Sequence, residues 1–416
     1  MRSLLGLALA TLAAASLGGC GGTLYTSEGL PALPVTGSQC LPAQMSCDLG
    51  QGPVCAEHDV AHCASCTDAC PADPANGLQR CLESSAAAGD WACHLDCSAG
   101  WLRTGTACSR AAAVAAGDAH ACALAGGLVK CWGANGAGQV TGAGTSGNVL
   151  LPFDLASGAT LLAAGGTSTC AVIGGAVTCW GSVASPSPAV TTATALAVGA
   201  SHACALLSSG AIQCWGTGRA MTAAPTGSAF VAIATGSSHA CALDSGGAVT
   251  CWGDNAQGQL GGGTAATQSR VVFASGMAAI GAGYDQACAA EGSGTRALHC
   301  WGNGAAPAQV TRVNFDAVEI APGRAHVCVH KAAEGPKCFG DNGLGQLGQA
   351  VVNAGELSTV PSPGAGSFTL AAGRDHTCSL FPDGSAQCWG ANASAQLGTG
   401  SAAPVAAGTV VTVSGR

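Results

Sequence analysis

The sequence predicts an all-β fold, and three of its features lead to this prediction. The chain holds 64 Gly but only 2 Tyr and 7 Phe, a composition typical of short strands and turns with small side chains. It is 48% apolar and 9% charged, which excludes a disordered chain. From Ala111 onward, one unit of sequence recurs seven times. We therefore expect a seven-bladed β-propeller over residues 111–416, preceded by a small disulfide-rich module.

The charge distribution excludes several classes of function. The net charge is −8, and the 14 Lys and Arg are scattered instead of forming a basic stripe, so we expect no nucleic-acid partner. No cluster of carboxylate, Lys and His interrupts the repeats, although catalytic groups need individually tuned environments. We expect no enzymatic activity and no cofactor.

The N-terminus resembles a bacterial lipoprotein signal peptide. Arg2 precedes an apolar run over Leu4–Leu17, and the sequence Leu-Gly-Gly-Cys that ends at Cys20 resembles a lipobox. In such proteins residues 1–19 are removed and the cysteine thiol is acylated, so this resemblance implies that Cys20 is a membrane anchor. The alternative is an ordinary secretory signal that contains a chance cysteine.

Residues 20–39 are expected to form a lipid-anchored linker, because Gly and Pro punctuate them and no chemistry is visible there. No Asp follows Cys20 to indicate retention at the inner membrane. The predicted location is therefore the cell envelope, with the outer membrane favoured.

The next segment, residues 40–108, holds ten cysteines. Exported chains meet an oxidising compartment, so we interpret these cysteines as the disulfides of a small stapled module. Its last part, from Cys93 to Cys108, resembles the end of an epidermal-growth-factor-like module. A zinc site is the alternative interpretation, because imidazole and thiolate ligands stand at short spacing. Its ligands would be His58, His62, Cys63, Cys66 and Cys70.

The repeated unit reads Gly, two residues, usually His, then Ala-Cys, a Gly turn and Cys-Trp-Gly. Its clearest copy runs from Gly199 to Gly216. Apolar residues alternate with period two on both sides of the turn, which predicts an antiparallel hairpin. Seven units of about 44 residues are typical of a propeller, because one blade cannot bury its own faces. The Trp should pack on the adjacent blade.

Each hairpin places its two cysteines opposite each other, at a separation that a disulfide tolerates. We expect one disulfide in each blade. The pairs are Cys122 with Cys131, Cys170 with Cys179, Cys204 with Cys214, Cys241 with Cys251, Cys288 with Cys300, Cys328 with Cys338, and Cys378 with Cys388.

After Trp-Gly, the fullest copies continue as Asp254–Gly261 and Asp341–Gly348. These segments resemble the Trp-Gly-x-Asn-x-x-Gly-Gln-Leu-Gly signature of the regulator of chromosome condensation family, and units one and seven match it in part. The resemblance implies a seven-bladed propeller. WD-type propellers are the rival, but their Gly-His pair stands farther from Trp than the 13 residues between His202 and Trp215. Nuclear members of the family promote nucleotide exchange on a small GTPase, which an exported chain does not meet.

Unit one lacks one of the extended segments that the other units show. The C-terminal run Val405–Val413 has the missing pattern. We expect this run to complete the first blade.

Five histidines occupy one repeat position, where a ring of imidazoles could in principle bind a metal. Ser168 and Gln286 replace His in two units. Both side chains form hydrogen bonds but are poor metal ligands. We therefore expect each His to hydrogen-bond the backbone of its own blade, and no metal site. These histidines are His120, His202, His239, His326 and His376.

The function predicted from these features is that of a cell-envelope lipoprotein whose propeller is a protein-binding or adhesion scaffold. The expected partners are an unknown protein and, through the anchor, the membrane; the chain is expected to be monomeric. Candidate contact surfaces are the loops Asn135–Asn148, Asp254–Gln268 and Asp341–Glu356. The main alternative is an enzyme inhibitor that resembles propeller-type β-lactamase inhibitors, and a metal-dependent propeller enzyme is a weaker one.

Replacing the anchor residue tests the lipoprotein hypothesis. We expect the Cys20→Ala chain to leave the membrane fraction, because the buried acyl chains that hold it there are lost. Fractionation of cells that export either form, followed by immunodetection, measures this. A Cys20→Ala chain that still partitions into membranes would contradict the hypothesis.

Overall fold

The structure, a computed structural model, divides into two compact units, Met1–Asp96 and Cys97–Arg416. The described part contains no helix, and therefore no helix that could cross a membrane. The described residues are 44–48, 53–57, 77–83, 91–97, 101–104, 107–144, 147–218, 224–261, 269–292, 297–303, 305–310, 317–331, 334–349, 358–360, 369–381, 385–406 and 410–413.

The first unit contains two two-stranded sheets. One pairs β1 (Gln44–Asp48) with β2 (Pro53–Glu57), and the other pairs β3 (Gly77–Glu83) with β4 (Trp91–Cys97). The predicted lipidation site Cys20, the linker and the residues of the alternative zinc site lie outside the described residues. The limits predicted for the signal peptide, linker and cysteine-rich module therefore stay predictions.

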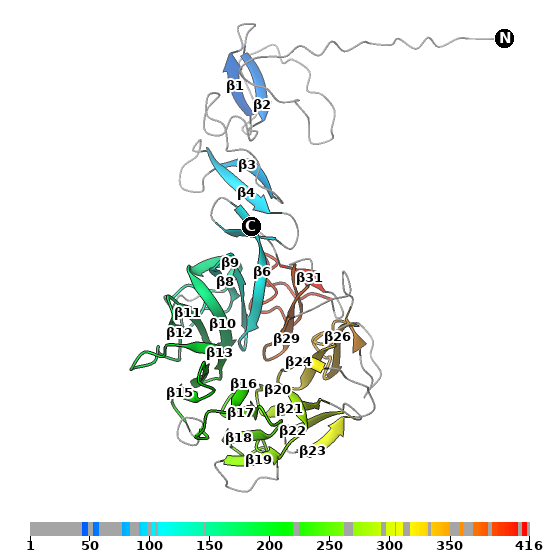
Figure 1. Ribbon diagram of the computed structural model, residues 1–416. Coiled ribbons are helices and arrows are strands. Elements are labelled where there is room, and N and C mark those ends of the chain that lie inside the picture. The colour runs from blue at the N-terminus through cyan, green and yellow to red at the C-terminus, as the bar shows by residue number, and fades with distance from the viewer. Residues whose placement is uncertain are drawn as a thin grey trace, which may run out of the picture. The chain divides into compact units, whose positions relative to one another are not determined.

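The second unit is a propeller of seven sheets, which follow one another around a central axis (Figure 1). We number the blades in chain order. Their strands are, for blade 1, β5 (Trp101–Thr104), β6 (Ala107–Ala116), β7 (His120–Ala125), β8 (Leu128–Gly133) and β9 (Val149–Ala156); for blade 2, β10 (Ala159–Gly165), β11 (Ser168–Ile173) and β12 (Ala176–Gly181); for blade 3, β13 (Ala193–Val198), β14 (His202–Leu207) and β15 (Ile212–Gly216); for blade 4, β16 (Phe230–Thr235), β17 (His239–Asp244), β18 (Val249–Gly253) and β19 (Ser269–Phe273); for blade 5, β20 (Met277–Gly283), β21 (Gln286–Glu291), β22 (Leu298–Gly302) and β23 (Ala305–Val310); for blade 6, β24 (Ala317–Pro322), β25 (His326–Lys331), β26 (Glu334–Gly340) and β27 (Ser358–Thr359); and for blade 7, β28 (Thr369–Ala372), β29 (His376–Leu380), β30 (Ala386–Gly390) and β31 (Val411–Thr412). The all-β prediction and the seven blades are confirmed.

The hairpin that the alternating pattern predicts is formed by β7 and β8 in blade 1 and by the second and third strands of each other blade. Its two cysteines are opposed in register and joined by a disulfide. Their Cα atoms lie 4.0 to 4.1 Å apart, closer than opposed residues without such a bond. The seven pairs are Cys122–Cys131, Cys170–Cys179, Cys204–Cys214, Cys241–Cys251, Cys288–Cys300, Cys328–Cys338 and Cys378–Cys388, the same pairs that the spacing predicts.

The signature that follows Trp-Gly folds into a compact segment, which we call the tail of a blade. In blade 4, the side-chain oxygen of Asn255 accepts a hydrogen bond from Leu260 N at 2.9 Å, and that of Gln259 accepts one from Gln257 N at 2.8 Å. The tail thus satisfies its own backbone with its Asn and Gln side chains. The main-chain oxygen of Gln259 is left to accept the indole N–H of Trp301 in blade 5, at 2.8 Å.

The prediction that Val405–Val413 completes the first blade is wrong. Strand β31 pairs with β30 of blade 7, with Val411 opposite Cys388. Blade 1 needs no such strand, because β6 begins at Ala107 and β9 follows its tail. Blades 1 and 7 meet without sharing a strand: Trp132 of blade 1 donates to the main-chain oxygen of Gln396 in blade 7 at 2.8 Å, Gly400 N donates to Leu150 O at 3.1 Å, and both blades share one apolar cluster.

The glycine of the Gly-x-x-His motif is required because there is no room for a larger residue. A Cβ atom on Gly199 would lie 2.5 Å from Cε1 of His202 and 2.5 Å from the main-chain oxygen of Gly236 in the next blade. Both distances are far below contact. The motif glycine therefore lets the imidazole of its own blade and the backbone of the next blade approach together.

Substituting this glycine tests that explanation. We expect Gly199→Ala to destabilise the propeller by about 1 to 3 kcal/mol, because the added methyl group overpacks the blade interface. Gly147→Ala is the matched control, since a Cβ there meets nothing within 4 Å. Thermal and denaturant unfolding of the two variants measures the difference; equal stabilities would contradict the steric explanation.

Candidate functional site at the channel mouth

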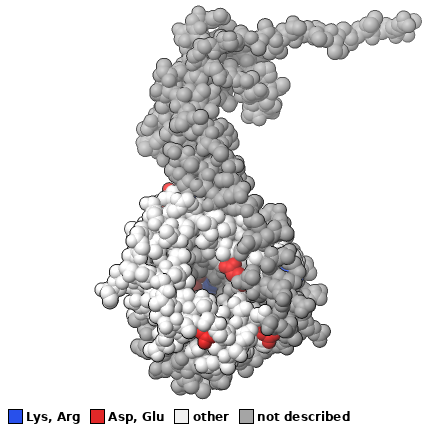
Figure 2. Space-filling view, viewed as in Figure 1, with Lys and Arg blue, Asp and Glu red and all other residues white. Residues whose placement is uncertain are grey.

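The innermost strands of the seven blades surround a channel with a volume of about 300 Å³. Its lining is Ala, Val, Leu and Ile, apart from Gly281, Pro322, Thr235 and one ionisable group, Glu319. A carboxylate oxygen of Glu319 accepts a hydrogen bond from Leu370 N at 3.0 Å. Burial nevertheless raises the pKa of Glu319 to about 7. On the face seen in Figure 2, few charged side chains lie on the described part and its middle is hollowed.

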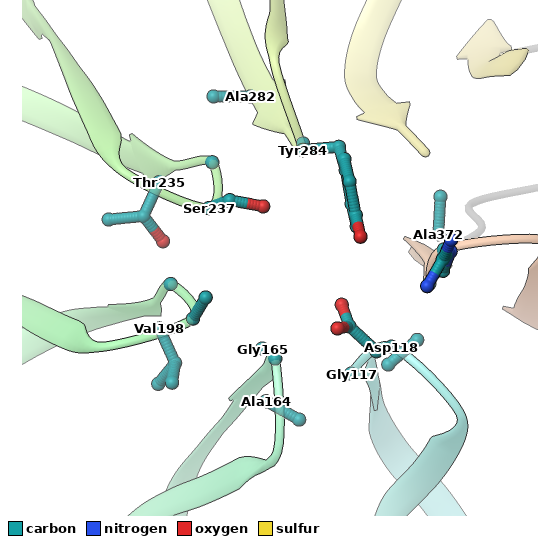
Figure 3. A pocket seen from close by; sticks show the side chains of 18 of the residues that line it. Gly117, Asp118, Ala164, Gly165, Val198, Thr235, Ser237, Ala282, Tyr284 and Ala372 are labelled. Carbon is teal, nitrogen blue, oxygen red and sulfur yellow. The ribbon is translucent and has the colours of Figure 1, made fainter. Parts of the chain in front are cut away.

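One end of the channel is formed by the turns that join β6 to β7 in blade 1 and the first strand to the second in each other blade. The residue after the motif glycine occupies these turns, and it differs from blade to blade although the glycine before it is present in all seven. In chain order the seven residues are Asp118, Gly166, Ala200, Ser237, Tyr284, Arg324 and Arg374. All but Arg324 line a pocket (Figure 3), which we call the mouth.

Backbone hydrogen bonds between neighbouring turns hold the mouth in place. Arg374 N donates to Asp118 O at 3.3 Å, and Asp118 N donates to Gly166 O at 2.8 Å. On the other side, Ser237 N donates to Tyr284 O at 2.8 Å. The side chains of the mouth are therefore presented from a rigid ring.

The charged side chains of the mouth and its tyrosine lie in one half, on blades 5, 7 and 1. The side chains of Tyr284 and Asp118 point toward one another across its middle (Figure 3). The guanidinium carbon of Arg374 lies 5.5 Å from the centre of the Tyr284 ring, a distance at which the cation is attracted to the ring face. Burial raises the pKa of Asp118, an effect that Arg374 opposes and Asp375 reinforces.

The two arginines meet at Asp375. Arg324 contacts one carboxylate oxygen of Asp375 through Nη2 at 2.9 Å and through Nε at 3.0 Å. Arg374 Nε lies 3.5 Å from the other oxygen. Blades 2, 3 and 4 contribute only Gly166, Ala200 and Ser237 to the mouth at this variable position, so its second half is uncharged.

The five repeat histidines lie at blade interfaces. Nε2 of His120 lies 3.0 Å from the hydroxyl of Thr169 in blade 2, and Nε2 of His326 lies 2.8 Å from the hydroxyl of Thr377 in blade 7. These imidazoles reach the next blade, so for them the expectation of a bond to their own backbone is wrong. Within the described ranges, no group of three or more His, Cys, Asp or Glu could hold a metal ion.

Some residues of the predicted contact loops are buried and stabilise the fold. Asn135 and Gln139 of the first loop are 1% and 2% exposed, because they form the interior of a tail. The mouth residues were missed by the sequence analysis. The available signal was the variation between Gly and His in the repeated Gly-x-x-His motif, where the first position ranges from Gly to Arg.

The buried histidines make stability depend on pH. Burial lowers the pKa of His376 to about 3, well below its usual 6.5. The unfolded chain therefore takes up a proton first as pH falls from 6.5, which costs on the order of 1 kcal/mol of stability per pH unit for each such histidine. Glu319 has the opposite effect, because its raised pKa favours the folded state as pH falls below 7.

We expect His376→Gln to flatten the loss of stability between pH 6.5 and 4, because it removes one of the buried imidazoles. Gln is tolerated at this position: in blade 5, Gln286 Nε2 donates to Gly323 O at 2.9 Å. Unfolding free energies of both forms across this range measure the slope. Parallel pH profiles would contradict the assignment of a neutral, buried His376.

Known proteins resemble this chain in its repeats and in its fold. Residues 193–219, 230–259 and 369–396 match the regulator of chromosome condensation (RCC1) repeat. Human WBSCR16 has a similar structure, with a TM-score of 0.55 and 16% identity over 68% of this chain and 87% of that one. Prp20p from Saccharomyces cerevisiae gives a TM-score of 0.44 and 21% identity over 72% and 76%. No curated protein sequence matches. The second unit is thus a seven-bladed β-propeller, and three of its repeats match the regulator of chromosome condensation repeat.

Proposed function

We propose that the chain is an exported, lipid-anchored protein whose propeller binds a protein partner at the channel mouth. The observation that carries this proposal is the variable position after each motif glycine. It breaks the symmetry of the repeats only in side-chain chemistry, while the backbone of the ring is retained. Such a surface can specify a partner without any change in the scaffold.

The mouth has the composition of a recognition surface. Asp118, Tyr284 and Arg374 bring both signs of charge and an aromatic ring to one place, and Tyr and Arg are enriched among the residues that dominate protein–protein binding. Nucleic acid would favour an uninterrupted basic surface, whereas both arginines here lie beside Asp375. A partner with complementary charges fits this pattern.

Rigidity supports binding as well. Each blade carries a disulfide, and tails and indoles connect neighbouring blades. Little conformational freedom remains to be lost when a partner docks, so more of the contact energy contributes to affinity. Enzyme inhibition, the alternative from the sequence, would use the same property.

A photocrosslinking residue at Ser237 tests the proposal. Ser237 lies in the uncharged half of the mouth, where an added side chain displaces no ion pair. In cells that export the full chain, we expect Ser237 to crosslink to a defined protein. Replacing Arg374 by Ala in the same chain should lower the yield about tenfold, as expected when an important contact residue is truncated.

Ser209 is the matched control, because it is exposed in the turn between β14 and β15, at the other end of its blade. The same crosslinker at Ser209 should not capture that protein. Equal capture from both positions, or an Arg374→Ala chain with unchanged yield, would contradict binding at the mouth. Loss of an enzymatic activity of the captured protein on binding would identify the chain as an inhibitor.

A further inference from the structure

The channel is an apolar cavity with a single ionisable side chain among the residues that line it, Glu319 of β24. Its volume of about 300 Å³ is at the lower limit of the range for small-molecule sites. Sites of this kind combine apolar walls with a few polar groups that orient the ligand. The channel therefore has the size and the lining of a site for one small molecule.

Glu319 is held at the wall of the channel by one hydrogen bond. Its Oε2 accepts from Leu370 N of blade 7 at 3.0 Å. The other oxygen, Oε1, has no hydrogen-bond partner in the described part of the chain, and it is not one of the polar atoms that are both buried and without a partner. Oε1 is therefore accessible, and Glu319 can present it to a ligand in the channel.

Among the described residues, no positively charged side chain offsets the charge of Glu319. Burial raises the pKa of its carboxyl to about 7, and the interaction that opposes this effect is the hydrogen bond from Leu370 N. The flanking innermost strands, β20 and β28, carry no ionisable side chain. His330 of β25 lies opposite Glu319 in register, but no ion pair joins them in the part of the chain that is described. An ionised Glu319 thus lacks a compensating charge, which a cationic ligand would supply.

The walls of the channel also offer hydrogen-bond acceptors to a cation. In the described structure, the first strands of blades 2 to 7 pair with a neighbour on one side only, so their other edge presents main-chain carbonyl groups. An ammonium group has three N–H donors and no acceptor. It can therefore bond to Oε1 of Glu319 and to carbonyl groups of the wall at the same time.

The channel is continuous with the mouth, because one residue of each blade lines both. These residues are Ala116, Ala164, Val198, Thr235, Ala282, Pro322 and Ala372. Glu319 lies three residues before Pro322 along β24, a rise of about 10 Å. A ligand bound at Glu319 can therefore extend along the apolar walls toward the mouth.

We propose that the channel binds a primary alkylammonium, with its ammonium group on Oε1 of Glu319 and its aliphatic chain along the Ala, Val, Leu and Ile side chains of the walls. An organic anion would place a second negative charge beside Glu319. A metal ion needs several protein ligands, and the described residues contain no group of three or more His, Cys, Asp or Glu that could hold one. The proposal does not depend on the proposed function.

The probe is n-hexylamine, which is charged at neutral pH, and hexanol is its uncharged counterpart. The reporters are the five isoleucines of the full chain, labelled at a methyl group for NMR and identified by Ile→Val replacements. Ile233, Ile280 and Ile320 line the channel, whereas Ile173 and Ile212 do not. We expect millimolar hexylamine to shift the three channel resonances and to leave the other two in place.

Replacing Glu319 by Gln tests the charged contact. Glu319→Gln keeps an oxygen that can accept from Leu370 N but removes the charge. We expect it to weaken hexylamine binding about tenfold, the effect of losing a hydrogen bond to a charged group, and to leave the weaker binding of hexanol unchanged. Glu291→Gln is the matched control, because Glu291 bonds to His299 and does not line the channel. It should bind hexylamine as the wild type does.

A lysine side chain ends in the same ammonium group, so a free amine and a lysine of the partner are two sources of one chemistry. The crosslink from Ser237 distinguishes them. If the partner inserts a lysine into the channel, Glu319→Gln and an excess of hexylamine should each lower the yield. An unchanged yield assigns the channel to a free amine.

Channel resonances that do not move at millimolar hexylamine would overturn the proposal, and so would shifts confined to Ile173 and Ile212. Equal affinity of hexylamine for the wild type and Glu319→Gln, or equal affinity of hexylamine and hexanol for the wild type, would overturn it too. The titration contains no partner protein, so its failure would leave the proposed function unaffected.

Discussion

The close approach of neighbouring blades at the channel is the constraint on which this structure depends. In the five blades that carry the repeat histidine, the motif glycine lies between that imidazole and a main-chain oxygen of the next blade, with no room for a Cβ atom. This contact fixes how near the turns come, so that they can exchange hydrogen bonds around the mouth. The position after the glycine is then free to vary. A strict steric requirement at one residue thus creates a permissive position at the next.

The sequence predicted the features that repeat within each unit and the packing of Trp on an adjacent blade, but it missed the polar contacts between copies. The hairpins and their opposed cysteines follow from period-two alternation and local spacing, which a single unit contains. The bond from Trp301 to the carbonyl of Gln259 joins two units, and nothing inside either unit shows it. The same holds for His120, whose Nε2 lies near Thr169 of the following blade.

The placement of the last strand, β31, also depends on a contact that the sequence pattern does not contain. The pattern of residues 405–413 predicted a strand correctly, and β31 forms there. It did not predict which blade this strand would join, because every blade offers a similar outer edge. The extended segment before each unit was assigned to the blade that follows it. In the structure such segments, β19, β23 and β27, pair with the third strand of the blade that precedes them, and β31 does the same in blade 7.

The contiguity of every blade has a consequence for the order in which the chain matures. No strand is exchanged between the first and last blades in the part of the chain that the structure describes, and each disulfide joins cysteines only 9 to 12 residues apart. Each hairpin can therefore oxidise as soon as its own residues are available, without waiting for distant segments. The partner of Trp132, the carbonyl of Gln396, arrives 264 residues later. Until the last blade is present, the apolar flank of blade 1 that packs on it is uncovered.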